Sequence, residues 1–254
     1  MKKNIKQITE VSWTAIINNG NILKGEKKRL DYEHDFIKEY NSIGKLTEAK
    51  FYGADGTLLY KTFYEYYELE NKIEEITIHS SGGENRLIKT YNQKGDEVEE
   101  AFYVDGDLNY ITHKAYLENG QKVESVYHNI SNNQKSKTVW INDENHNNIE
   151  MLGFNYDGSL DFKRLSKYDE RGNGIEWAHY NQDGKLESRY KRKFDSMNNE
   201  IEWITDYDSD LNDSEYLKKS WIYKYDENDN WIEKIYFENN VPKGILEREI
   251  TYYD

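Results

Sequence analysis

The sequence predicts an all-β fold: antiparallel β-hairpin units with a period of about 25 residues, joined into one long, twisted or spiralled sheet. Three observations support this class. A dipeptide recurs at an almost constant interval, turn-forming residues occupy two fixed positions of each unit, and apolar and polar residues alternate between those turns. No stretch places apolar residues at helical spacing over three turns. These properties are typical of a β-solenoid-like repeat protein.

The recurring dipeptide is Ile/Val-Glu. Its copies begin at Ile73, Val98, Val123, Ile149, Ile175, Ile201 and Ile232. They are 25, 25, 26, 26, 26 and 31 residues apart, which indicates an internal repeat. In most units an aromatic residue precedes the pair by seven positions, as at Tyr66, Tyr91, Tyr116, Tyr168, Phe194 and Tyr225. The unit that contains Ile149 lacks this aromatic residue.

Each unit carries two turn signals. Four residues after the aromatic position stand Gly44, Gly95, Gly120, Gly172, Asn198 or Asp229, with Glu70 as the exception. These residue types tolerate the positive φ that a tight turn requires. The second signal is Asp-Gly, at Asp55-Gly56, Asp105-Gly106, Asp157-Gly158 and Asp183-Gly184. Two turns per unit leave two strands of roughly eight residues each, and so about eighteen strands in all.

The repeat covers the chain without a linker or a change in composition, so we expect one domain over residues 1–254. Residues 1–35 are predicted to form an N-terminal cap, residues 36–235 the repeats and residues 236–254 a C-terminal cap, because terminal repeats are atypical. The single proline, Pro242, falls in the last unit, where a lost ladder hydrogen bond matters least.

The charge balance bears on partners. Lys and Arg number 34 against 48 Asp and Glu, a formal net charge of -14. Phosphates would be repelled, so neither nucleic acid nor an anionic membrane is an expected partner, and a basic protein surface is the natural complement. The alternative is that the acidity only keeps a long sheet soluble. The first residues, Met1 to Gln7, are followed by no long apolar run, so we expect a cytoplasmic protein.

The sequence offers no signal for catalysis, a cofactor or a metal. Cysteine is absent, and none of the six histidines forms a His-x-His or His-x-x-x-His pair. No nucleophile elbow, phosphate loop or dinucleotide fingerprint occurs. We therefore expect a protein that is not an enzyme, with no catalytic residues, no metal site and no cofactor.

Two features remain as candidate partner-binding sites. The first is the acidic stretch in the one lengthened unit, with Asp206, Asp208, Asp210, Asp213 and Glu215. Its spacing fails the calcium-loop pattern, because Asp213 stands where glycine is required, so a solvated turn or a partner-binding loop is expected. The second feature is formed by Trp177, Trp203 and Trp221, which could hold a sugar ring or a partner's side chain, or could simply stabilise the sheet.

Two local patterns complete the candidates. If strand phase is kept, Trp231 lies on the face opposite to that of Ile232. The basic run from Arg189 to Lys193 is interpreted as one side of cross-strand ion pairs with Glu200 and Glu202, rather than as a nucleic-acid site.

The strings Tyr168-Asp169-Glu170-Arg171-Gly172-Asn173 and Tyr225-Asp226-Glu227-Asn228-Asp229-Asn230 resemble the YD repeats of the Rhs family, and the related MORN-like repeat proteins of antitoxin type. The resemblance covers roughly residues 36–254. It implies a spiralling sheet that encloses or presents another polypeptide. This chain is too short to enclose a toxin, so the resemblance implies a stand-alone, non-enzymatic binding protein.

Together these observations favour a cytoplasmic immunity or antitoxin protein that covers a basic toxin. Two alternatives stay open: a carbohydrate-binding or surface-presented YD-repeat protein, and a structural scaffold.

Overall fold

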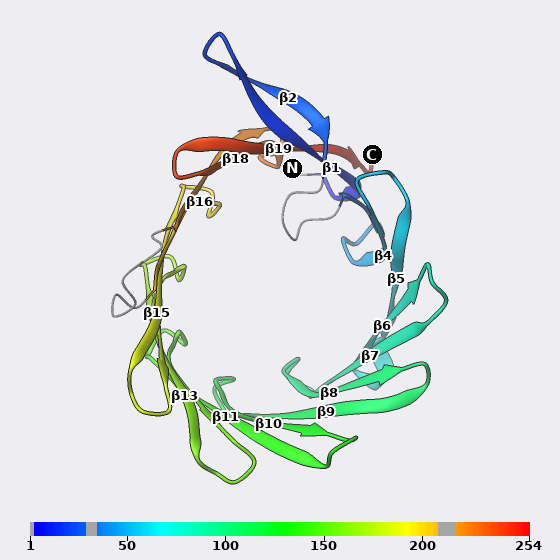
Figure 1. Cartoon of the computed structure of the whole chain (residues 1–254). Coiled ribbons are helices and arrows are strands. Elements are labelled where there is room, and N and C mark those ends of the chain that lie inside the picture. Colours follow the sequence, from blue (N-terminus) through cyan, green and yellow to red (C-terminus); the bar gives the residue numbers. More distant parts are fainter. Residues whose placement is uncertain (1–2, 29–34, 208–216) are drawn as a thin grey trace. The chain divides into compact units, whose positions relative to one another are not determined.

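The computed structural model describes residues 3–28, 35–207 and 217–254. Within these ranges the chain is all-β, with nineteen strands in one sheet and a single 3-10 turn, η1 (Glu68–Glu70) (Figure 1). Every strand pairing with a defined register is antiparallel. No helix among the described residues has the length and apolar character needed to cross a membrane.

The strands are β1 (Ile5–Asn18), β2 (Asn21–Lys27), β3 (Asp35–Tyr40), β4 (Leu46–Tyr52), β5 (Leu58–Tyr67), β6 (Lys72–His79), β7 (Glu84–Tyr91), β8 (Glu97–Val104), β9 (Asp107–Tyr116), β10 (Lys122–Asn129), β11 (Gln134–Asn142), β12 (Asn148–Phe154), β13 (Leu160–Tyr168), β14 (Gly174–Asn181), β15 (Leu186–Phe194), β16 (Glu200–Tyr207), β17 (Leu217–Tyr225), β18 (Trp231–Glu238) and β19 (Val241–Tyr252).

The predicted turn positions are confirmed by backbone conformation. Gly172 has φ 81°, and the equivalent Asn198 and Asp229 have φ 63° and 62°. Where the turn signal failed, the chain supplies another residue of positive φ: Asn71 follows Glu70 with φ 48°, and His146 serves the unit of Ile149 with φ 66°. An Asp or Asn side chain stabilises most turns of this set. Asp169 Oδ1, for example, accepts the backbone N–H of Asn173 at 2.8 Å.

A β-bulge follows this type of turn. In the β15–β16 hairpin the register shifts between Lys193 and Phe194, so that Phe194 lies opposite Glu200. The same shift places Tyr225 opposite Trp231 at the start of β18. The Trp231 ring then packs at 6.0 Å from Tyr223, on the same side of the sheet. The bulge changes the strand phase here, so the condition on which Trp231 was expected to lie on the opposite face is not met.

The prediction of one long, twisted or spiralled sheet is wrong. The first strand pairs with the last: β1 and β19 are antiparallel from Ile5↔Tyr252 to Thr14↔Gly244. The sheet therefore closes through its terminal strands, whereas a β-solenoid ends in caps that do not meet. The other edge of β1 pairs with β3 over Gln7–Glu10 and, further along, with β2, which forms a hairpin arm on the end of β1.

Contact density divides the chain into two units, and each is described by itself. Unit 1 comprises Met1–Glu65, Glu75–Asn85 and Lys219–Asp254, and unit 2 comprises Tyr66–Glu74 and Arg86–Lys218. In unit 1 the buried core includes Ile245 and Leu246 of β19, which are 3% and 2% exposed, and Ala49 of β4, which is 0% exposed. In unit 2 the buried positions hold small residues such as Ala101, Ala178 and Ser188, so that no thick apolar core forms there.

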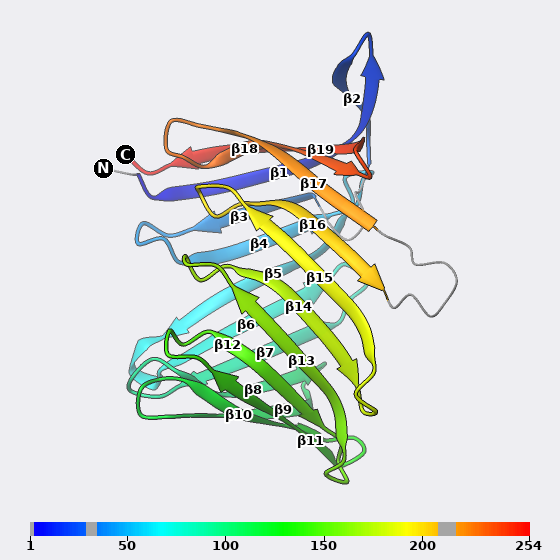
Figure 2. The ribbon, with the colours of Figure 1, turned by 90° about the vertical axis from the view of Figure 1, so that its left-hand side faces the viewer.

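In unit 2, β11–β16 lie side by side in chain order (Figure 2), and the two faces of this part of the sheet differ in chemistry. One face carries cross-strand pairs of lysine and glutamate, with Lys163 at 2.8 Å from Glu150 and Lys193 at 2.7 Å from Glu202. We call it the ion-pair face. The other carries Trp140, Arg164, Trp177, Tyr190 and Trp203 with their same-side neighbours, and we call it the tryptophan face.

Candidate ligand-binding site

The acidic stretch gives no site that can be described. Asp208, Asp210, Asp213 and Glu215 lie outside the described residues. Asp206 is the penultimate residue of β16, and its backbone lies opposite Arg189 of β15. The partner-binding role of these acids stays a prediction.

The tryptophans separate into two places. Trp177 and Trp203 line one hollow in unit 2. Trp221, by contrast, belongs to unit 1, where its ring stacks on Tyr236 with a centroid separation of 6.2 Å. Two of the three predicted tryptophans are thus brought together, and they define the candidate site.

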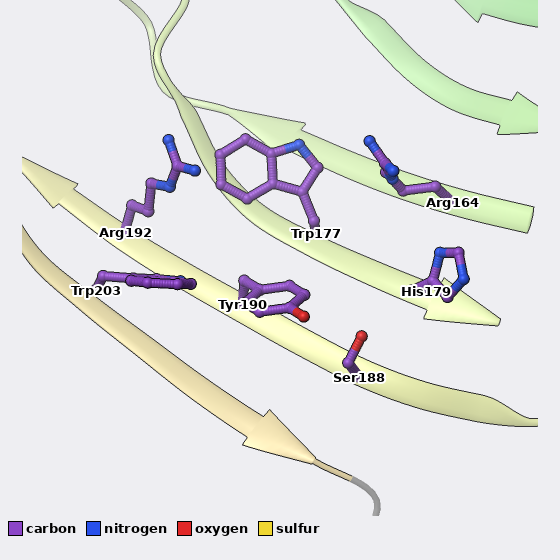
Figure 3. Close-up of a pocket in the computed structure, with 7 residues that line it drawn as sticks. All are labelled: Arg164, Trp177, His179, Ser188, Tyr190, Arg192 and Trp203. Atoms are coloured by element: carbon purple, nitrogen blue, oxygen red, sulfur yellow. The ribbon is translucent and has the colours of Figure 1, made fainter. Parts of the chain in front are cut away.

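The hollow has a volume of about 640 Å³ and opens on the tryptophan face of β13–β16 (Figure 3). It is lined by Arg164, Trp177, His179, Ser188, Tyr190, Arg192 and Trp203. All seven side chains project to the same side of their strands. The lining therefore comes from four consecutive strands of a local meander rather than from a loop.

Strand register explains why these residues meet. Arg164 lies directly opposite His179, which lies opposite Ser188. One row further along, Trp177 lies opposite Tyr190. Residues directly opposite in an antiparallel pair share a face with Cβ atoms about 4.5–5.5 Å apart, so each row places its side chains in contact range.

Trp177 is held from two sides. The Arg192 guanidinium carbon lies 4.3 Å from the centroid of its ring. On another side the indole lies against the backbone of Gly174, where an added Cβ would be only 2.5 Å from Trp177 Cζ2. Arg192 is itself fixed by Glu200, with Nε at 3.2 Å from the carboxylate. This glutamate is the residue that the bulge at the start of β16 brings opposite Phe194.

The second aromatic pair of the hollow is Trp203 on Tyr190. Their centroids are 5.8 Å apart and their planes differ by 26°, a stacked arrangement. Next to it, the His179 ring lies 5.2 Å from Phe162. The hollow thus presents flat ring surfaces at its base and sides.

The charge of the lining is positive. It contains two arginines and a histidine but no carboxylate, although the chain as a whole carries -14. Arg164 has no ion-pair partner among the residues that the structure describes. His179 has a distant one, Glu187 at 3.7 Å. An unpaired guanidinium beside aromatic rings is suited to a ligand that combines negative charge with a flat ring.

Catalytic or metal chemistry has little support in the same place. His179 and Ser188 face each other across β14 and β15, but these two described side chains share no hydrogen bond that would activate the serine. The described residues contain no group of three or more His, Cys, Asp or Glu placed to hold a metal ion.

Sequence reasoning missed five of the seven lining residues. It interpreted the run around Arg192 as ion pairing, and this is confirmed in part: Arg192 pairs with Glu200, and Lys193 with Glu202. The signal that could have separated these neighbours is alternation, because Tyr190 and Arg192 fall on one face and Lys191 and Lys193 on the other.

Comparison with known proteins gives no family. No family model and no curated protein matches the sequence. Among solved structures, a porin-like protein from Bacteroides uniformis aligns over 97% of this chain and 98% of its own, with 10% identity and a TM-score of 0.46. A porin-like protein from Bacteroides vulgatus aligns over 99% of each chain, with 13% identity and a TM-score of 0.38. The Photorhabdus luminescens Tc holotoxin pore aligns over 96% of this chain but 13% of its own, with 14% identity and a TM-score of 0.37.

The porin-like matches contradict several expectations from the sequence. We withdraw the assignment to Rhs-like YD repeats and the cytoplasmic location. We also withdraw the immunity function, its alternatives as a carbohydrate-binding or surface-presented repeat protein and as a scaffold, and the expectation of a basic protein partner without membrane contact. At TM-scores below 0.5, these likenesses assign neither a function nor a location to this chain.

Proposed function

We propose that this chain is a binding protein without catalytic activity, and that the hollow on the tryptophan face takes an anionic ligand with a flat ring. The observation that carries the proposal is Arg164, a cation without an ion-pair partner among the described residues, standing beside three aromatic rings in a lining free of carboxylates. Stacking supplies affinity for any flat ring, and the guanidinium selects for charge.

The two arginines have different roles in this proposal. Arg192 is occupied by Glu200 and by the Trp177 ring, so it positions the aromatic surface. Arg164 is left to meet the ligand's negative group. Loss of Arg164 should therefore reduce the preference for charged ligands, while loss of Trp177 should reduce affinity for charged and neutral ligands alike.

The test uses two pairs of probes that differ only in charge: thymidine 5′-monophosphate against thymidine, and indole-3-acetate against indole-3-acetamide. Titration calorimetry is expected to show tighter binding of the acid in at least one pair. Arg164→Met should weaken that acid by at least about ten-fold, as loss of a charged hydrogen bond implies, without affecting its neutral partner.

Lys163→Met is the matched control, because Lys163 is the neighbouring residue on the ion-pair face, where it pairs with Glu150. It should leave all probe affinities unchanged. Equal affinity for acid and neutral probes, or an Arg164→Met protein with unaltered preference, would overturn the proposal. The proposal would also be overturned if none of the four probes bound with a dissociation constant in the millimolar range or below.

A further inference from the structure

A second tryptophan in unit 2 repeats the arrangement of Trp177 and Arg192. On β11, the Trp140 ring has the Lys122 ammonium 4.0 Å from its centroid, close to the 4.3 Å between Arg192 and Trp177. Lys122 is the first residue of β10 and lies opposite Tyr116, before the register shift that precedes Glu124. Each of these two tryptophans therefore has a cation over its ring.

Arg164 lies between the two arrangements. Trp140 faces Met151 of β12, and Met151 faces Arg164 of β13, so these three residues form one row on the tryptophan face. With neighbouring strands about 4.8 Å apart, Trp140 is roughly 10 Å from Arg164 across the sheet. On its other side Arg164 adjoins the strand of Trp177. The guanidinium therefore has one tryptophan on either side.

The surface between the two tryptophans fits a continuous ligand. Met151 is half-buried and offers a deformable apolar surface between the rings. The nearest carboxylate of β12, Glu150, pairs with Lys163 on the opposite face. Burial lowers the pKa of Lys122, the charge of Lys114 lowers it further and the charge of Glu97 opposes both, so an added negative group would stabilise this ammonium.

We propose that Trp140 with Lys122 is a second ring-binding subsite, and that the ligand consists of two rings joined through an anionic group held by Arg164. The inference rests on the proposed function and specifies its ligand. A phosphodiester that joins two nucleosides has this chemistry.

The experiment compares one-ring and two-ring probes on the whole chain. Thymidylyl-thymidine is compared with thymidine 5′-monophosphate. The two-ring probe is expected to bind at least about five-fold more tightly than the one-ring probe, since stacking on one further ring is worth at least that factor.

Trp140→Ala should abolish that gain and leave the affinity for the one-ring probe unchanged. Ile141→Ala, the next residue and on the opposite face, is the matched control and should keep the gain. Lys122→Met keeps the Trp140 indole and should reduce the gain only in part. The circular dichroism spectra of Lys122→Met and Trp140→Ala should match the spectrum of the parent protein.

Three outcomes would overturn the inference: no gain for thymidylyl-thymidine, a gain that survives Trp140→Ala, or an equal gain for a dinucleoside whose link is uncharged. Absence of one-ring binding in the parent chain would instead overturn the proposed function, so the two failures are distinguishable.

Discussion

The pKa and the packing of a single aromatic residue in this sheet depend on the side chains directly beside it. Tyr110 shows this on β9: its ring stacks on Phe102 at 5.2 Å and contacts Tyr127 at 5.1 Å. Its hydroxyl donates to Glu100 Oε1 at 3.2 Å. Burial, and then the neighbouring Glu100 charge, raise the pKa of Tyr110 to about 12, because both disfavour the phenolate.

This shift predicts a loss of stability in alkali. Since the folded pKa of Tyr110 lies above its unfolded value of about 10, its contribution is complete below pH 10 and is lost as the pH rises toward 12. Urea unfolding at pH 9 and pH 11 should show a larger drop for the parent than for Tyr110→Phe. Tyr156→Phe, at a residue 70% exposed, is the control and should drop like the parent. Equal drops in parent and Tyr110→Phe would contradict the assignment.

At the scale of the hairpin, the turn depends on local residue types, so its position can be predicted well from the sequence. Positive φ at Gly172, Asn198 and Asp229 depends on residue type, and these types stand at a fixed distance from the aromatic marker. The face of a residue after the turn is harder to predict, because one bulge reverses the alternation. The strand phase assumed for Trp231 fails for that reason, and the contact of Lys122 with Trp140 was missed.

In the candidate site, too, some features could be predicted from the sequence and others could not. The equivalence of Trp177 and Trp203 in successive units was visible in the sequence, and both line the hollow. Arg164 and His179 come from β13 and β14, and only the strand register places them opposite each other. Register depends on turn length and bulges together, so a pattern of apolar residues alone could not supply it.

Turn conformation gives a second prediction. Gly172 has φ 81°, and an added Cβ would meet nothing closer than Asn147 Oδ1 at 3.8 Å. Gly172→Ala should therefore destabilise the chain through backbone strain alone, by about 1–2 kcal/mol in urea unfolding. Gly172→Asn should be milder, because Asn occupies the equivalent turn position at residue 198 with φ 63°. An alanine variant as stable as the asparagine variant would show that the strain is relieved elsewhere.

For the whole chain, the decisive contact joins its two ends. The β1–β19 pairing connects residues more than two hundred positions apart, and the Tyr253 amide donates to the Asn4 carbonyl at 2.9 Å. A repeat with a regular period predicts neighbours along the chain, but nothing within one unit specifies that the first strand will meet the last. The repeat pattern therefore does not decide between an open and a closed sheet, and the pairing of the two ends is a contact of very large sequence separation.

A buried ion pair holds the two terminal strands together at Glu10 and Arg248. The Arg248 Nε lies 2.7 Å from a Glu10 carboxylate that is 5% exposed, and the guanidinium carbon lies 3.5 Å from the Trp231 centroid. Glu10→Ala leaves the Arg248 guanidinium, whose side chain is only 23% exposed, without this carboxylate, so it should destabilise by about 2–3 kcal/mol, below the range for a fully buried pair. The double change Glu10→Leu with Arg248→Met should be less damaging than Glu10→Ala, since it leaves no uncompensated charge. Urea unfolding of the two variants measures the difference. A double variant less stable than Glu10→Ala would mean that Arg248 acts mainly through Trp231, and that stacking rather than charge pairing secures the terminal strands.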